Sequence, residues 1–144
     1  MSRYKRVLVA VDLTDEAHEV AEKAAMICSD NNAQLHIVHA IEPLSFAYGG
    51  DIPMDFTGIQ AEIQKQAELK LAATAQKYGI KEEHQFLVIG RPETEIHNLT
   101  KEHNIDLVVI GSHGRHGLGL LLGSTANGVL HGSQCDVLAV RVGQ

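Results

Sequence analysis

The fold is decided by residues 105–125, which read IDLVVIGSHGRHGLGLLLGST. An apolar run comes first, and Gly111 then opens a segment that holds five of the chain's thirteen glycines. Glycine in such quantity lowers stability unless the backbone needs unusual angles or another molecule must approach it closely. The stretch therefore predicts a buried strand that leads into a loop with a special task.

Short apolar runs alternate with amphipathic segments along the rest of the chain. Five runs are almost continuously apolar, as strands buried on both faces are, and they cover residues 6–12, 33–40, 84–90, 105–111 and 136–142. Apolar stripes at helical spacing predict four helices, over residues 13–30, 57–78, 92–104 and 124–132.

This alternation of strands and helices predicts an α/β fold, a single-domain, Rossmann-like open sheet of five parallel strands with helices on both faces. The length of 144 residues fits one domain, residues 1–144. One connection, residues 42–58, is longer than most loops of such folds. It follows the second strand, so we expect it at the carboxyl edge of the sheet.

Composition excludes two classes of partner. The formal net charge is −6 and the chain has no long run of lysine or arginine, which argues against nucleic acid as the main partner. No stretch approaches the roughly 20 apolar residues that a membrane-spanning helix needs. We therefore expect neither a nucleic-acid partner nor a membrane span.

The opening segment and the cysteines indicate the compartment. Residues 3–12 are basic and then apolar, but the apolar part is short and ends at Asp12, so we interpret it as a strand and not as a signal peptide. Cys28 and Cys135 lie far apart and form no disulfide framework. Reduced thiols and a cytoplasmic location are the expectation.

The glycine-rich stretch predicts a site for an anion such as phosphate. After the fourth strand ends, a turn at Gly111 and Gly114 can present backbone N–H groups, and Arg115 can supply charge. The next helix begins with three residues that add amides, hydroxyls and the positive end of a helix dipole, namely Gly123, Ser124 and Thr125. The alternative is a tight loop that binds no ligand, and the glycines alone leave this open.

Two familiar phosphate motifs are absent. A P-loop requires a lysine after its glycines, and no lysine follows Ile105. The dinucleotide pattern G-x-G-x-x-G also fails, because the third glycine after Gly117 and Gly119 would fall on Leu122. Any phosphate site in this chain is therefore of a different type.

The sequence resembles the universal stress protein family over essentially its whole length. The resemblance is carried by residues 111–142, by the preceding DLVVI and by the opening RVLVAVDLT, and it is weakest in residues 42–58. The branch of that family that binds adenine nucleotides carries G-x2-G-x9-G-[ST]. Gly111, Gly114, Gly123 and Ser124 match this pattern in type, with eight residues where nine are usual.

The resemblance implies a role for each matching position in binding ATP or AMP. Asp12 would lie near the adenosine, with Ala10, Val11 and Leu13 as walls of the pocket, and the backbone at Ala40 would meet adenine. The remaining residues would contact ribose and phosphates: Gly111, Ser112, His113 and Gly114, with Gly123, Ser124 and Thr125 on the phosphate tail.

Asp12 also has a physical argument of its own. A carboxylate at the carboxyl edge of a strand can accept hydrogen bonds from ribose hydroxyls. The alternative is that Asp12 caps the following helix, and the two roles are compatible.

Few residues of the chain are placed to hold a metal ion or to act as a nucleophile. His36 and His39 point to opposite faces of a strand and cannot share one metal, while His113 and His116 lack further ligands. A Mg²⁺ ion held mainly through the phosphates is compatible with the site. The chain has no G-x-S-x-G elbow, and neither cysteine belongs to a catalytic motif.

The phosphate site that the residues predict, together with the resemblance, implies a cytoplasmic adenine-nucleotide-binding module of the stress response, with an unidentified protein partner. An apolar edge strand at residues 136–142 needs cover, and the resemblance implies a homodimer through it. One alternative is a slow ATP hydrolase or phosphotransferase that uses Asp12, His113 and Arg115, although these form no recognisable signature. The other is an interaction protein of this fold that binds no nucleotide.

Overall fold

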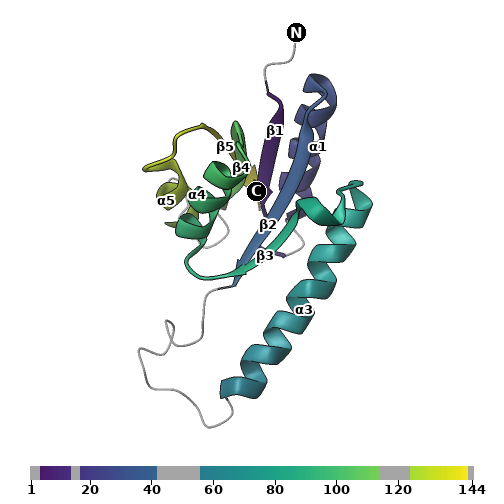
Figure 1. Ribbon diagram of the computed structural model, residues 1–144, viewed down its shortest axis with the longest axis vertical. Coiled ribbons are helices and arrows are strands. Elements are labelled where there is room, and N and C mark those ends of the chain that lie inside the picture. Colours follow the sequence, from purple (N-terminus) through teal and green to yellow (C-terminus); the bar gives the residue numbers. More distant parts are fainter. Residues whose placement is uncertain (1–3, 14–16, 42–55, 114–123, 143–144) are drawn as a thin grey trace.

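A five-stranded parallel sheet forms the centre of the molecule (Figure 1). The computed structural model describes residues 4–13, 17–41, 56–113 and 124–142. The strand order is β3-β2-β1-β4-β5. The strands are β1 (Arg6–Ala10), β2 (Gln34–Ile41), β3 (Gln85–Ile89), β4 (Leu107–His113) and β5 (Asp136–Val142). The predicted α/β fold is confirmed.

Helices cover both faces of this sheet (Figure 1). In the described part of the chain they are α1 (Ala17–Asn31), α3 (Phe56–Lys77), α4 (Pro92–Glu102) and α5 (Ser124–Leu130), with a short 3-10 helix, η1 (Glu82–His84). None of the described helices is long and apolar enough to cross a membrane.

Strand β1 separates two apolar cores, because neighbouring side chains of a strand point to opposite faces. Val7 and Val9 pack with residues of α1 and α3, whereas Leu8 packs with residues of α4 and α5. All three side chains are fully buried. At the start of this strand the Asp106 carboxylate accepts hydrogen bonds from two backbone amides, those of Lys5 and Arg6, at 2.9 and 3.1 Å.

Helix α3 is longer than the sheet that it covers (Figure 1). Ala67, Leu71 and Ala75 are buried, and the last two pack in the core on this face of the sheet. Ile59 and Ile63 continue the same predicted apolar stripe, yet they remain 40% and 38% exposed. The reason is geometric, because the amino-terminal half of α3 extends beyond the sheet.

Two predicted strand ends need correction. The first strand was expected to reach Asp12 but ends at Ala10, where its pairing with β4 stops at Ala10↔Ile110. The fourth was expected to end at Gly111 but continues to His113, because β5 runs beside it as far as His113↔Val142. A strand lasts as long as a neighbour satisfies its backbone, and the apolar pattern does not report where that neighbour ends.

The ends of three helices are set by residues with positive φ. Gly79 after α3 has a φ of +67°, and Asn32 after α1 and Asn104 after α4 have values of +54° and +53°. Glycine and asparagine are the residues that tolerate this left-handed conformation best. The predicted stop at Gly79 is confirmed.

Replacing Gly79 with alanine will isolate the cost of this backbone conformation, because a Cβ at Gly79 would meet no atom within 4 Å. We expect Gly79→Ala to lower the free energy of unfolding by about 1 kcal/mol, measured by urea denaturation. Gly79→Asn is the control, and it should lose less. If the alanine variant is as stable as the parent protein, the positive φ at position 79 does not strain a residue that has a Cβ.

Candidate functional site

The strand order reverses between β1 and β4. From β1 the chain passes through α1 to β2 on one side of β1, and after β3 it returns through α4 to β4 on the other side. Ligands of open α/β sheets bind at the carboxyl ends of the strands that flank such a reversal. Ala10 and Gly111, both predicted site residues, lie at this position.

Strands β1 and β4 stop pairing at this edge. After the last pair, Ala10↔Ile110, the backbone N–H of Val11 donates to the carbonyl oxygen of Val38 in β2 at 3.0 Å. On the other side β4 continues to pair with β5. The end of β1 therefore follows β2, while β4 follows β5.

His39 fixes the position of Val11. Its Nδ1 atom lies 2.8 Å from the carbonyl oxygen of Val11, and because a carbonyl can only accept, Nδ1 carries the proton. From the sequence, His39 was expected only as a possible metal ligand, and this contact was not predicted. The parallel register Ala10↔Val38 places residue 39 beside residue 11, and this register follows from the structure and not from either strand's sequence.

Asp12 and Leu13 continue the chain at this edge. Asp12 is exposed, so its carboxylate can meet a ligand from solvent. Leu13 has a φ of +62°, which costs a non-glycine residue about 1 kcal/mol, and such strain is concentrated at functional sites. Residues 14–16 lie outside the described residues, so the alternative role of Asp12 as a helix cap stays a prediction.

Ala40 lies within β2 and not beyond it, because β2 continues to Ile41. It is half-buried and pairs with Val88 of β3. In the strand order, β2 lies directly beside β1. Ala40 therefore belongs to the same edge of the sheet as Ala10.

The predicted turn at residues 111–114 is wrong for its first three members. Gly111, Ser112 and His113 are extended and pair with residues 140–142 of β5. Gly114, Arg115 and Gly123 lie outside the described residues, and their proposed roles stay predictions. The backbone of Ser124 and Thr125 opens α5, which confirms the predicted helix start.

Helix α5 is held closely against α4. A Cβ placed on Gly128 would lie 2.9 Å from the Cβ of Glu93, so only glycine allows the helices to approach this far. The Nε2 atom of His97 lies 2.8 Å from the carbonyl oxygen of Val129, which is fully buried. These contacts fix the helix whose first turn is the predicted phosphate half-site.

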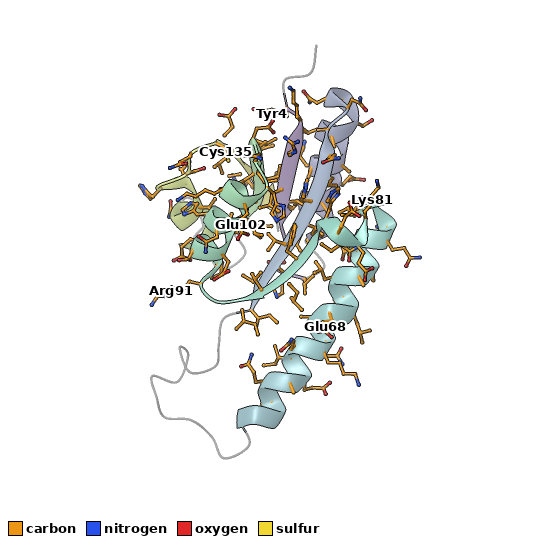
Figure 2. The ribbon with its side chains drawn as sticks, in the orientation of Figure 1. Tyr4, Glu68, Lys81, Arg91, Glu102 and Cys135 are labelled. Carbon is orange, nitrogen blue, oxygen red and sulfur yellow. The ribbon has the colours of Figure 1, made fainter. Side chains whose placement is uncertain are left out.

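The two cysteines, Arg91 and the candidate metal ligands were the other side chains considered for a chemical role. Burial raises the pKa of Cys28 to about 11 and also raises that of Cys135, so both thiols stay protonated at neutral pH. Arg91 is exposed and precedes Pro92 at the start of α4 (Figure 2). Within the described ranges, no three histidine, cysteine or carboxylate side chains are placed to hold a metal.

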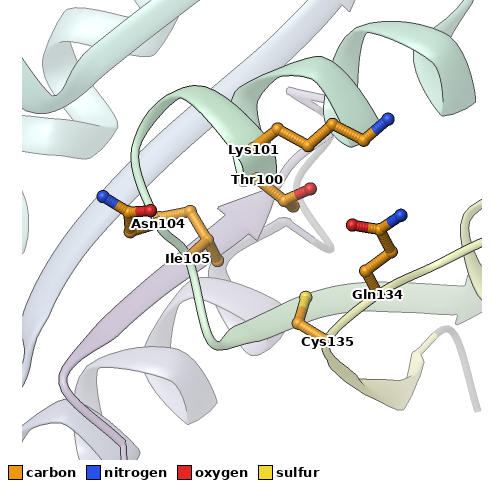
Figure 3. Close-up of a pocket in the computed structure, with 6 residues that line it drawn as sticks. All are labelled: Thr100, Lys101, Asn104, Ile105, Gln134 and Cys135. Carbon is orange, nitrogen blue, oxygen red and sulfur yellow. The ribbon is translucent and has the colours of Figure 1, made fainter.

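Two hollows of the described surface lie at the opposite edge of the sheet. One, of about 410 Å³, lies between the end of α4 and the start of β5 and is lined by Lys101, Gln134 and Cys135 among others (Figure 3). The other, of about 400 Å³, lies between the ends of α1 and α3. Neither includes a predicted site residue.

The chain matches known proteins over nearly its full length. The family model described as the universal stress protein family matches residues 3–141. Universal stress protein A homolog 2 of Coxiella burnetii is 39% identical over 146 residues, which cover 99% of this chain and 98% of the relative. The chain belongs to the universal stress protein family.

Solved structures agree with this fold. The structure of the hypothetical protein MJ0577 has a TM-score of 0.77 at 20% identity and covers 96% of each chain. A universal stress protein solved in complex with cAMP has a TM-score of 0.62 at 26% identity, covering 97% of this chain and 98% of that one.

Removing the His39 contact will measure how firmly it holds the end of β1. We expect His39→Leu to lower the free energy of unfolding by about 1–2 kcal/mol, because the Val11 carbonyl loses its donor at a half-buried position. His39→Asn keeps a side-chain N–H near the place of Nδ1 and should retain part of that stability. Equal losses in the two variants, compared by urea denaturation, would mean that the imidazole acts only by filling space.

Proposed function

We propose that this protein is an adenine-nucleotide-binding regulatory module of the stress response. The observation that carries the proposal is the end of β1, where the strand order reverses, β1 and β4 stop pairing, and Asp12 is exposed. A universal stress protein of similar fold was solved with cAMP, which is an adenine nucleotide. This supports an adenine ligand here.

The proposed ligand is ATP or AMP, and the described residues suit its nucleoside part. Asp12 offers a carboxylate to ribose hydroxyls, while Val11, held by His39 and Val38, forms a fixed wall beside it. Ala40 of the adjoining strand would meet adenine.

The phosphates would lie toward β4 and α5. The start of α5, at Ser124 and Thr125, would offer backbone amides and the positive end of a helix dipole. Gly111, Gly114 and Gly123 retain the types of the family's binding pattern. Mg²⁺, if present, would be held chiefly through phosphate oxygens.

A binding and signalling role suits the described chemistry better than catalysis. Both thiols are protonated at neutral pH, and the Nδ1 proton of His39 is engaged by a backbone carbonyl. The proposed compartment is the cytoplasm, where thiols are kept reduced. A bound nucleotide would then alter the surface that a protein partner recognises.

The first experiment identifies a ligand that the protein retains. The freshly purified protein is denatured, and the released small molecules are separated by chromatography and identified by mass. Titration of the emptied protein with ATP, AMP and cAMP then gives the affinities. Failure of all three to bind at millimolar concentration would overturn the proposed function, and phosphate release over many turnovers would show an enzyme instead.

Asp12→Asn tests the proposed ribose contact. Loss of a charged acceptor should weaken nucleotide binding about tenfold, because a hydrogen bond to a charged group contributes about 1.5–3 kcal/mol. Asp30→Asn makes the same change at an exposed site at the carboxyl end of α1 and should leave the affinity unchanged. Calorimetric titration of both variants provides the comparison, and equal affinities would remove Asp12 from the site.

We also propose that the protein is a homodimer that pairs through β5. This strand is one of the two edges of the sheet, and an uncovered edge presents unpaired backbone groups to other chains. Ala139 lies at its midpoint and is exposed. Two copies of β5 that pair about their midpoints would bring the two Ala139 residues together.

Lysine at this midpoint should separate the subunits. Ala139→Lys places like charges opposite each other, and like charges across a strand pair are destabilising. Ile89→Lys is the matched control, because Ile89 is exposed on β3, the other edge strand. By analytical ultracentrifugation we expect a monomer for the first variant and a dimer for the second. A monomeric parent protein would end the proposal.

A further inference from the structure

Three histidines from distant parts of the chain meet at the amino-terminal edge of the sheet. His36 of β2 lies with its ring centroid 4.2 Å from that of His84 in η1 and 6.0 Å from that of His103 after α4. Phe86 of β3 completes the group, since its ring is parallel to that of His36 at 6.3 Å and lies 4.7 Å from that of His103. This edge is opposite to the proposed nucleotide site.

The His36 ring is unusually isolated from water. The residue is only 3% exposed, and its Nδ1 atom is buried with no hydrogen-bond partner. A buried polar atom without a partner is costly, and a buried charge without a counter-ion costs far more. The ring is therefore tolerated in this position as a neutral group.

We propose that His36, His84 and His103 form an acid-sensitive latch, which holds η1 and the edge strand β3 against β2 and α4 only while the imidazoles are neutral. Each histidine comes from a different element, so repulsion among them acts directly on the packing of those elements. Among the described strands, edge strand β3 pairs with β2 alone, which makes it the part of the sheet that such repulsion would release.

The groups that face His36 favour its neutral form. Burial, and after it the charge of His84, lower the pKa of His36 to about 4. The Val7 backbone opposes this shift, and the smaller effects of His103, which lowers the pKa, and of the Gln34 backbone, which raises it, follow. Glu83 lies 3.8 Å from His84, but its side chain is 75% exposed, so solvent screens it. The negative end of the α4 dipole faces His103.

Acid should therefore destabilise the folded state through His36. The unfolded chain binds a proton at this ring near its ordinary pKa of 6.5, whereas the folded chain does so only near 4. The stability that this group contributes is complete above pH 6.5 and is lost as the pH falls toward 4. Such a latch would therefore open in response to a fall of the pH below neutrality.

The test compares unfolding of the parent protein and two variants in urea between pH 7.5 and pH 4.5. His36→Phe keeps an aromatic ring beside Phe86 and removes the titration. His131→Gln removes an exposed histidine and is the matched control. Over this range the folding equilibrium constant of the parent and of the control should fall by on the order of a hundredfold more than that of His36→Phe.

Two measurements on the unaltered protein keep the proposal testable if His36→Phe does not fold. NMR titration should place the midpoint of the His36 ring below pH 5, and a midpoint at pH 6 or above overturns the proposal. Hydrogen exchange, corrected for intrinsic rates, should show at pH 5 that amides of β3 lose protection before those of β1. A uniform loss across the sheet also overturns it.

A metal ion is the competing explanation of three neighbouring histidines. Zinc sulfate in excess at pH 7.5 should leave the unfolding midpoint of the parent protein unchanged, since no three histidine, cysteine or carboxylate side chains among the described residues are placed to hold a metal ion. A zinc-dependent rise in that midpoint would identify a metal site and overturn the latch.

Discussion

The position of β1 in the middle of the sheet is the constraint on which the rest of the structure depends. Its backbone pairs with β2 on one side and β4 on the other, and its side chains enter both apolar cores. Where it ends, its two neighbours lose their common partner and continue separately. The proposed ligand site is thus placed by strand order and by the length of one strand, before any side chain contributes.

Local sequence patterns were sufficient for the elements but not for their ends. The apolar runs and helical stripes predicted all five strands and the four described α-helices, because the spacing of apolar residues shows which face of an element is buried. The ends depend on partners. Asp12 follows an unbroken apolar run, yet it lies outside β1, and Ser112 is polar, yet it lies within β4 because β5 pairs with it.

The site was predictable only where a motif or a strand end marked it. Asp12 and Gly111 follow apolar runs, so their place at the carboxyl edge could be anticipated. The contact of His39 with Val11 depends on the register between two strands, which no single run of sequence contains. The contact of His36 with His84 and His103 was even less predictable from the sequence, because it forms only after three elements have packed together.

Strand β2 links the two edges of the molecule. His36 lies on the α4 side near its start, and His39 lies on the opposite face near its end. Release of β3 would remove one neighbour of β2 but not the other, because β1 pairs with β2 from Arg6↔Gln34 to Ala10↔Val38 and Val11 adds one more bond. The wall formed by Val11 and His39 depends on that second pairing. The proposed release of β3 by acid and the proposed nucleotide site at the other end of β2 are therefore compatible in one molecule, and the two proposed responses are separable by substitution at His36 or at Asp12.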